Sequence, residues 1–154
     1  MLILNENIKQ QLQEDAFRTF PDECCGFFFG NEQGEERKIT EILVVENAKS
    51  GDKRRRFEIT AKDYLNAELY AEKKSLRLLG IYHSHPNHPS IPSEHDRIAA
   101  QPFFSYIIIS VNEKEIPSIQ SWILNDNFQF EEEKILEIKS VTLWGLFNIV
   151  IKEE

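Results

Sequence analysis

Cysteine is scarce in this 154-residue chain, and its two copies, Cys24 and Cys25, are adjacent. Neighbouring side chains of a strand point to opposite faces, so a disulfide between these two is not expected. The pair also lacks the roughly two to four intervening residues that separate cysteines in a zinc pair. We therefore expect buried structural thiols rather than a disulfide, a thiolate zinc site or a catalytic nucleophile.

Positive charge is also lacking, because the formal net charge is -8 and the sequence pI is about 5.1. This balance argues against a nucleic-acid-binding protein, which needs net attraction to phosphate over a broad face. The one basic run, Lys53 to Arg56, follows the turn-like Ser50-Gly51-Asp52. Two interpretations of this run stay open: a solvated loop, or a local contact for anions or carboxylates beside a substrate groove.

The chain has no long apolar run. Residues 5–15 are polar and do not resemble a signal peptide, and the apolar segment Val141 to Ile151 has about half of the roughly 20 residues that span a bilayer. We expect a cytoplasmic protein without a membrane segment.

The chain does have enough apolar material for a core, with 41% hydrophobic residues and eleven Phe. Its length suits one domain. Asn5, Thr60 and Ser93 are expected to cap helices, which reach about Phe20, Leu76 and Ala100. The inward positions of the second helix are predicted to include Tyr64, Ala67, Leu69 and Ala71. The expected strands cover residues 2–4, 24–30, 38–46, 56–59, 78–84, 106–111, 116–124 and 128–132.

This order of elements predicts an α+β fold rather than a repeating βαβ design. The tail from Val141 to Ile151 stays ambiguous between a last strand and an apolar surface that docks a partner.

All four histidines fall between positions 83 and 95. His83 and His85 are two residues apart at the end of an expected strand, so both side chains project from one face and can reach the same ion. Asp96 falls in the first turn of the helix that Ser93 begins. A carboxylate there completes a His, His, Asp set that leaves one tetrahedral position open, as in a catalytic zinc site.

The spacing also has a purely structural interpretation. Ser93 and Asp96 have the spacing of a capping box, which satisfies the amides at a helix start. Strand histidines are often half-buried without binding a metal. The residues by themselves leave both interpretations open.

The segment resembles the motif of the JAMM (MPN+) metalloproteases. That motif reads His-Ser-His-Pro, then six residues, Ser, two residues and Asp. Here its positions are occupied by His83 to Pro86, Ser93 and Asp96. The segment Pro21 to Gly30 is similar to the family's upstream glutamate element in small free-standing prokaryotic members, with Glu23 as the glutamate. The resemblance runs from about residue 2 to residue 133. It implies a single-domain JAMM/MPN-like (cytidine-deaminase-like) mixed sheet flanked by helices, with residues 134–154 as an extension packed on the same domain.

The resemblance also implies roles for the residues of the motif. His83, His85 and Asp96 would bind one Zn²⁺ per chain. Glu23 would be the base that activates the water and then the acid that protonates the leaving amine. Ser93 would donate to the oxyanion of the tetrahedral intermediate.

The implied activity is hydrolysis of the peptide or isopeptide bond after the C-terminal Gly-Gly of a ubiquitin-like protein, such as a sulfur carrier or modifier. Two alternatives stay open: a non-catalytic MPN scaffold that binds a ubiquitin-like or other partner, and a different hydrolase like the DNA-repair-associated relatives. The sequence defines neither the particular partner nor the oligomeric state.

Overall fold

A computed structural model describes residues 1–143 and 147–153 of the chain. Nine strands form one mixed sheet in the order β7-β6-β5-β4-β2-β3-β1-β8-β9. The strands are β1 (Leu2–Asn5), β2 (Cys25–Gln33), β3 (Glu36–Val45), β4 (Arg77–Pro86), β5 (Ser105–Val111), β6 (Ser118–Leu124), β7 (Phe130–Glu133), β8 (Ile135–Leu143) and β9 (Phe147–Glu153). The helices are α1 (Glu6–Thr19), α2 (Ala61–Lys74) and α3 (Glu94–Ala99). The expected α+β sheet flanked by helices is confirmed.

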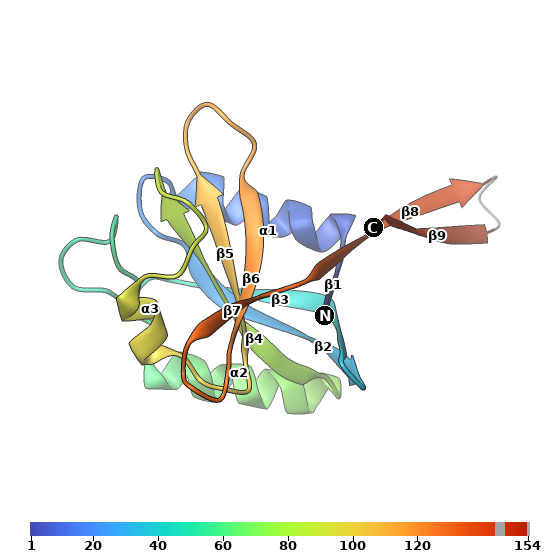
Figure 1. The fold of residues 1–154 in the computed structure, drawn as a ribbon, viewed down its shortest axis with the longest axis horizontal. Coiled ribbons are helices and arrows are strands. Elements are labelled where there is room, and N and C mark those ends of the chain that lie inside the picture. The colour runs from blue at the N-terminus through green and yellow to red at the C-terminus, as the bar shows by residue number, and fades with distance from the viewer. Residues whose placement is uncertain (144–146, 154) are drawn as a thin grey trace.

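The helices α1 and α2 cover opposite faces of the sheet (Figure 1). Alternation along β2 serves both layers, because Phe28 packs with the α1 residues and its neighbours Phe27 and Phe29 pack with the α2 residues. On β4, Tyr82 faces the α1 layer and Ile81 faces the α2 layer. His83 and His85 therefore follow Ile81 on the face that α2 covers.

The predicted caps of the two long helices are confirmed. Asn5 accepts a hydrogen bond from the amide of Ile8 at 2.8 Å, and Thr60 forms a capping box with Asp63. Leu69 was wrongly expected to face inward and is 53% exposed. It lies two residues from both Ala67 and Ala71, which are buried, so about 200° of helical rotation turns it to the outer face.

The predicted strand at residues 56–59 is wrong, because this segment has no partner strand. The buried side chain of Asn47 takes its backbone groups instead. The Asn47 amide group donates to the Arg56 carbonyl at 3.0 Å, and the Asn47 oxygen accepts from the Glu58 amide at 3.1 Å. A side chain thus supplies the bonds that a neighbouring strand would have made.

The extension beyond residue 133 begins by joining the sheet, because β8 pairs in parallel with β1. The strands β8 and β9 then pair with each other and project from the body as a hairpin (Figure 1). The ambiguous tail contributes to both strands, and its residues 144–146 lie outside the described residues. No helix within the described ranges is long and apolar enough to cross a membrane.

Candidate metal centre

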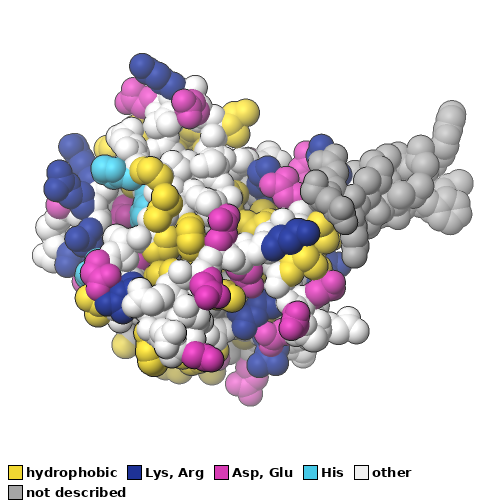
Figure 2. Space-filling view, in the orientation of Figure 1, with side chains coloured by type: hydrophobic (Ala, Val, Ile, Leu, Met, Phe, Trp, Pro, Cys, Tyr) yellow, Lys and Arg dark blue, Asp and Glu magenta, His cyan; other side chains and the backbone are white. Residues whose placement is uncertain are grey.

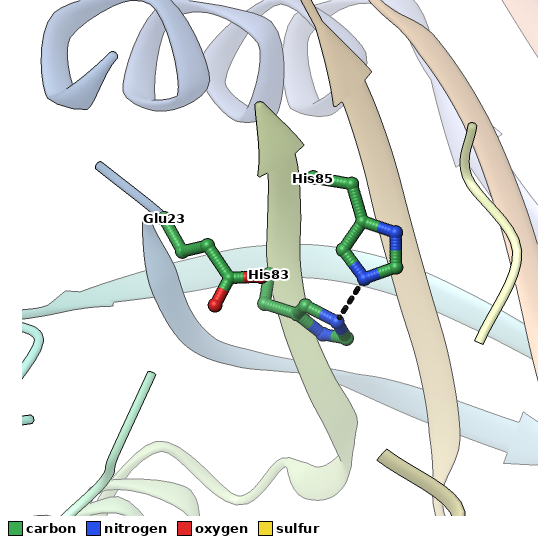
Figure 3. A group of neighbouring side chains, drawn as sticks. All are labelled: Glu23, His83 and His85. Carbon is green, nitrogen blue, oxygen red and sulfur yellow. Dashed lines mark hydrogen bonds between the residues drawn. The ribbon is translucent and has the colours of Figure 1, made fainter. Parts of the chain in front are cut away.

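Two histidine rings meet at the end of β4. His83 and His85 project from the same face of the strand, as their spacing predicts, and their Nε2 atoms are 3.1 Å apart (Figure 3). His83 is buried, with 1% of its surface exposed, and its ring stacks on Phe57 with centroids 4.5 Å apart. The packing against Phe57 fixes the plane of the His83 ring.

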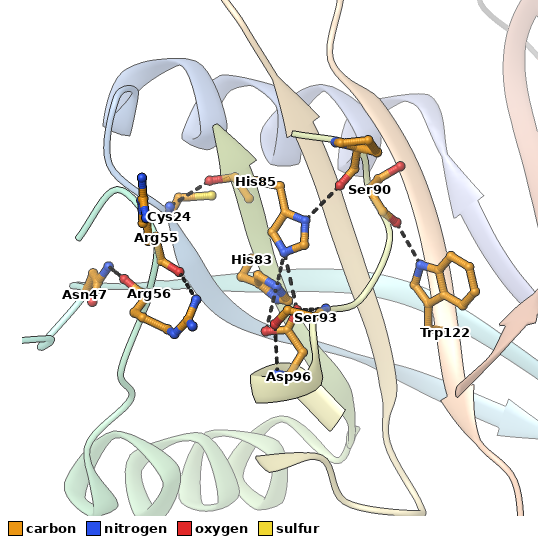
Figure 4. A network of polar contacts seen from close by, with 12 residues as sticks. Cys24, Asn47, Arg55, Arg56, His83, His85, Ser90, Ser93, Asp96 and Trp122 are labelled. Carbon is orange, nitrogen blue, oxygen red and sulfur yellow. Dashed lines mark hydrogen bonds and ion pairs between the residues drawn. The ribbon is translucent and has the colours of Figure 1, made fainter. Parts of the chain in front are cut away.

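Asp96 reaches the same two rings from the first turn of α3 (Figure 4). Its Oδ1 is 3.4 Å from the His83 Nε2, and its Oδ2 is 3.3 Å from the His85 Nε2. The expected capping box is also present: the Ser93 amide donates to the Asp96 Oδ2 at 2.8 Å, and the Asp96 amide donates to the Ser93 Oγ at 3.1 Å. The cap is thus compatible with a ligand role, since it fixes the carboxylate and leaves Oδ1 facing the rings.

These distances match the edges of a metal coordination polyhedron. With bonds of about 2.05 Å, neighbouring ligand atoms are about 3.3 Å apart around a tetrahedral ion and about 2.9 Å apart around an octahedral one. The two Nε2 atoms are 3.1 Å apart, and each has an Asp96 oxygen at 3.4 or 3.3 Å, a different oxygen in each case. The three groups are therefore close enough to share one ion and leave room for another ligand.

Hydrogen bonds orient the second histidine. The His85 Nδ1 lies 2.8 Å from the carbonyl oxygen of Pro89. Because a carbonyl only accepts, Nδ1 carries the proton and the Nε2 lone pair points toward the other ligands. The loop that supplies this carbonyl is itself held, since the Trp122 Nε1 donates to the Ser90 carbonyl at 2.9 Å and the Ser90 hydroxyl donates to Gln120 at 2.6 Å.

Glu23 lies just before β2, on the same face of the sheet. Cys25 pairs with His83 in the antiparallel register of β2 and β4, and this register continues to a hydrogen bond from the Ser84 amide to the Cys24 carbonyl. One further step places Glu23 opposite His85. Glu23, His83 and His85 offer ligand atoms that all lie within 4.8 Å of one another, and the described residues thus contain a group that could hold a metal.

The site contains polar atoms that the described protein leaves without partners. Among all the described residues, three buried side-chain atoms have no hydrogen-bond partner. Two of them lie in this site: the Glu23 Oε2 and the His83 Nδ1. Burial of an unpaired polar atom is costly, so native proteins keep few of them. The Glu23 carboxylate lies beside the two histidines, and its unpaired oxygen fits a site that binds a group from outside the protein.

Burial and charge shift the titration of all four groups. Burial raises the pKa of Glu23 to about 8 and lowers the pKa of His83. Burial also acts on Asp96 and His85, but their mutual hydrogen bond and charge outweigh it, which lowers the pKa of the carboxyl and raises that of the imidazole. Without a metal, the site thus favours an ionised Asp96 and a protonated Glu23 at neutral pH.

A cavity of about 310 Å³ adjoins these residues. About half of its lining is apolar or aromatic, and its polar lining comprises Lys49, Glu58, His83, His95 and Asp96. Its lining includes Phe57, Ile59, Tyr64, Ile81, Ala99 and Tyr106. A substrate chain at the candidate metal centre would therefore have a partly apolar recess beside it.

Residues outside the motif also build the site. The buried Asn47 donates to the Glu23 carbonyl at 3.1 Å, and the Glu23 amide donates to the Lys53 carbonyl at 2.8 Å. Sequence reasoning did not identify Asn47, since an Asn between a strand and a turn is ordinary. Ser84 faces away from the rings and its hydroxyl oxygen accepts from the Cys24 amide at 2.8 Å.

The cysteines do not join this site. Both are free and buried, and burial raises the pKa of Cys25 to about 12, which opposes a thiolate nucleophile.

The fold and the His, His, Asp arrangement define a JAB-type domain. The family model for prokaryotic homologs of the JAB domain matches residues 5–125, and the chain belongs to this family. The JAMM resemblance of the sequence is thereby confirmed.

Three relatives illustrate the similarity. The chain is 32% identical over 114 residues to a desampylase of Pyrococcus furiosus, which covers 74% of this chain and 75% of the relative. The solution structure of a protein from Desulfitobacterium hafniense superposes with a TM-score of 0.80 and 28% identity, covering 89% and 92% of the two chains. A protein from Salinibacter ruber gives a TM-score of 0.66 and 32% identity, covering 88% and 90%.

Proposed function

We propose that this chain is a zinc-dependent peptidase or isopeptidase that hydrolyses the bond after the C-terminal Gly-Gly of a ubiquitin-like protein. The observation that carries the proposal is that the His83 and His85 Nε2 atoms lie 3.1 Å apart, each within 3.4 Å of an Asp96 oxygen, with the Glu23 carboxylate beside them. The relative named desampylase supports the same class of reaction. We further propose that residues 2–133 form the peptidase domain and that 134–154 are an extension of it.

The donor set suits zinc. Two imidazoles and one carboxylate that leave one position open are typical of catalytic zinc. The same donors also form the facial set of non-haem iron sites, so measurement of the bound metal distinguishes the two. Zinc held by His83, His85 and Asp96 would supply a Lewis acid that polarises the substrate carbonyl and makes water a stronger acid.

The protein's own residues would move the protons. Glu23, in a buried position that raises its pKa, would accept a proton from the attacking water on its free Oε2 and then deliver that proton to the leaving amine. The Ser93 Oγ accepts from the Asp96 amide and keeps its own hydrogen, which it would donate to the carbonyl oxygen as negative charge develops there.

Metal content measured on protein purified without chelator tests the site. We expect about one zinc per native chain, none in Asp96→Ala or His83→Ala, and full content in His88→Ala, which removes an exposed histidine of the same segment. Iron in place of zinc would contradict the proposed metal. No bound metal, even after incubation with excess zinc, would favour a binding scaffold.

Cleavage assays test the reaction. Fusions that place a fluorescent reporter after a Gly-Gly-tailed ubiquitin-like protein should be cut after the second glycine by the native chain. Glu23→Gln should keep zinc and lose cleavage by about two orders of magnitude or more, since the general base is removed while the ligands stay. Zinc binding without cleavage of any such fusion would contradict the proposed substrate class.

A further inference from the structure

The loop between β3 and α2 concentrates positive charge in an acidic chain. Residues 49–56 contain five Lys or Arg residues and one acidic residue, Asp52, whereas the other 146 residues contain 13 Lys and Arg against 25 Asp and Glu. Figure 2 shows Lys and Arg side chains gathered at one edge of the molecule, beside the histidines. The cationic loop comprises Lys49, Lys53, Arg54, Arg55 and Arg56.

The cationic loop is fastened to the candidate metal centre. The carbonyl of Lys53 accepts from the amide of Glu23. The amide group of Asn47 donates to the Glu23 carbonyl at 3.1 Å and to the Arg56 carbonyl at 3.0 Å; Figure 4 shows the contact with Arg56. The next residue, Phe57, stacks on His83. The loop backbone therefore forms one wall of the site, and its side chains cannot move far from the site without breaking these bonds.

The positive charges are available to a ligand. Arg54, Arg55 and Arg56 are exposed. Arg55 forms an ion pair with Asp52 at 4.0 Å. Both of these side chains are more than half exposed. Such an exposed pair at the distance limit is weak and exchanges readily for another carboxylate.

We propose that the cationic loop is a recognition site for an acidic segment of the ubiquitin-like substrate, within a few residues of its Gly-Gly tail. The inference rests on the proposed function for the identity of the substrate, and the loop supplies the preference for acidic chains. An extended chain advances about 3.3 to 3.6 Å per residue, so side chains about three to six residues before the scissile bond lie about 10 to 20 Å from the metal centre. The backbone bonds of Lys53 to Glu23 and of Arg56 to Asn47 keep the exposed arginines near the metal centre.

Charge outside the loop favours a short acidic protein segment over a polynucleotide. The remainder of the chain is strongly acidic and repels a long polyanion that runs past the loop. The attraction comes from the loop alone, which suits a short cluster of carboxylates that contacts the loop and little else. This attraction is local, and added salt should weaken it by screening.

Binding of labelled peptides tests the proposal. The probes are fluorescein-labelled ten-residue peptides that end in a free Gly-Gly, with Glu, Gln or Lys at the third to sixth positions from the C-terminus, measured by anisotropy. At about 0.05 M NaCl we expect the Glu peptide to bind at least about tenfold more tightly than the Gln peptide. At about 1 M NaCl, where the screening length is about 3 Å, the preference should fall below about twofold.

A charge-matched pair of variants separates local from global charge. The triple change Arg54→Gln, Arg55→Gln and Arg56→Gln should remove the preference for Glu. The control, Lys38→Gln, Lys73→Gln and Lys114→Gln, alters exposed residues elsewhere by the same total charge and should retain the preference. Equal behaviour of the two triple variants, or equal binding of the Glu and Gln peptides by the native chain, would overturn the proposal. Tighter binding of a labelled 12-nucleotide dT strand than of the Glu peptide would also overturn it.

Cleavage of coumarin amides of the same peptides separates this inference from the proposed activity. If the native chain cuts the Gln peptide and the arginine triple variant cuts it equally well, the arginines act on substrate preference alone. If no peptide or carrier fusion is cut, the peptidase proposal fails, while the anisotropy results still decide whether the loop selects acidic segments.

Discussion

Replacement of Glu23 by Gln should stabilise the metal-free protein at neutral pH and leave it unchanged in acid. The Glu23 carboxyl is 4% exposed, its Oε2 has no partner, and its burial raises the pKa from 4.5 to about 8. A folded-state pKa above the unfolded value means that the contribution of this group to stability is fully present below about pH 4.5 and is lost as the pH rises through about 8. Gln has nearly the same shape and does not ionise.

The expected gain in the free energy of unfolding follows from the same two pKa values. A pKa change from 4.5 to about 8 corresponds to about 5 kcal/mol at most, at about 1.4 kcal/mol per tenfold change in the ionisation constant. Local opening and water entry relax a buried carboxylate, so about 2 kcal/mol at pH 8 is a realistic expectation. For a chain of this size, this raises the melting temperature of Glu23→Gln by about 4 to 8 °C relative to the native chain.

The assay is urea unfolding of chelator-treated native chain and Glu23→Gln at several values between about pH 4 and pH 8. The two unfolding midpoints should coincide near pH 4 and separate as the pH rises, with the variant more stable. Added zinc should reduce the difference, since a nearby cation favours the ionised carboxylate. A difference between the two midpoints that stays constant across the whole pH range would refute the reasoning. It would mean that Glu23 ionises as freely in the folded chain as in water.

Three further predictions concern the surroundings of the site. Asn47→Ala should cost about 3 kcal/mol in urea unfolding, because it leaves buried backbone partners of Glu23 and Arg56 unpaired; a loss below about 0.5 kcal/mol would contradict this bridging role. Tyr82→Phe removes the 2.8 Å hydrogen bond to the buried Asp15 and should cost about 1 to 2 kcal/mol in the same assay, with an unchanged value counting against the bond. Metal affinity should rise with pH through the pKa of His85, because a proton competes with the metal for the ligand nitrogen. Burial lowers this pKa, but the hydrogen bonds to Asp96 and to the Pro89 carbonyl outweigh burial and raise it above 6.5. Competition with a chromogenic chelator between about pH 6 and pH 8 measures the last effect, and a flat profile would exclude it.

The local parts of the site could be predicted from sequence because each depends on one element. Alternation on one strand places His83 and His85 on one face, and a capping pattern places Asp96 at a helix start. Glu23 is different, since it is about 60 residues away and reaches the rings through the pairing of β2 with β4. Periodicity does not encode strand pairing, so only the family resemblance identified Glu23.

The two wrong predictions about the fold, the strand at residues 56–59 and the inward Leu69, also arose from contacts between distant parts of the chain. Residues 56–59 form no strand although their β propensity favours one, because the buried Asn47 side chain bonds to Arg56 and Glu58 and the Ala48 amide donates to the Glu58 carbonyl. Leu69 was assigned inward by its hydrophobicity, but the small side chains of Ala67 and Ala71 allow α2 to lie close to the sheet and thereby decide which face is buried. In both cases a tertiary contact overrode a local preference.

The positions of the unpaired atoms connect stability to function. Two of the three unpartnered buried side-chain atoms in the described residues belong to Glu23 and His83, in a fold whose core is otherwise well paired and apolar. A site selected for stability alone would replace Glu23 with an apolar residue or pair its oxygen. The chain instead holds this carboxylate by both backbone groups, through Asn47 and Lys53, with its free oxygen beside the two rings. Such rigid support for an energetically unfavourable group is expected where the group must act on something bound there, and it is the reason that the stability gain of Glu23→Gln should be accompanied by loss of cleavage.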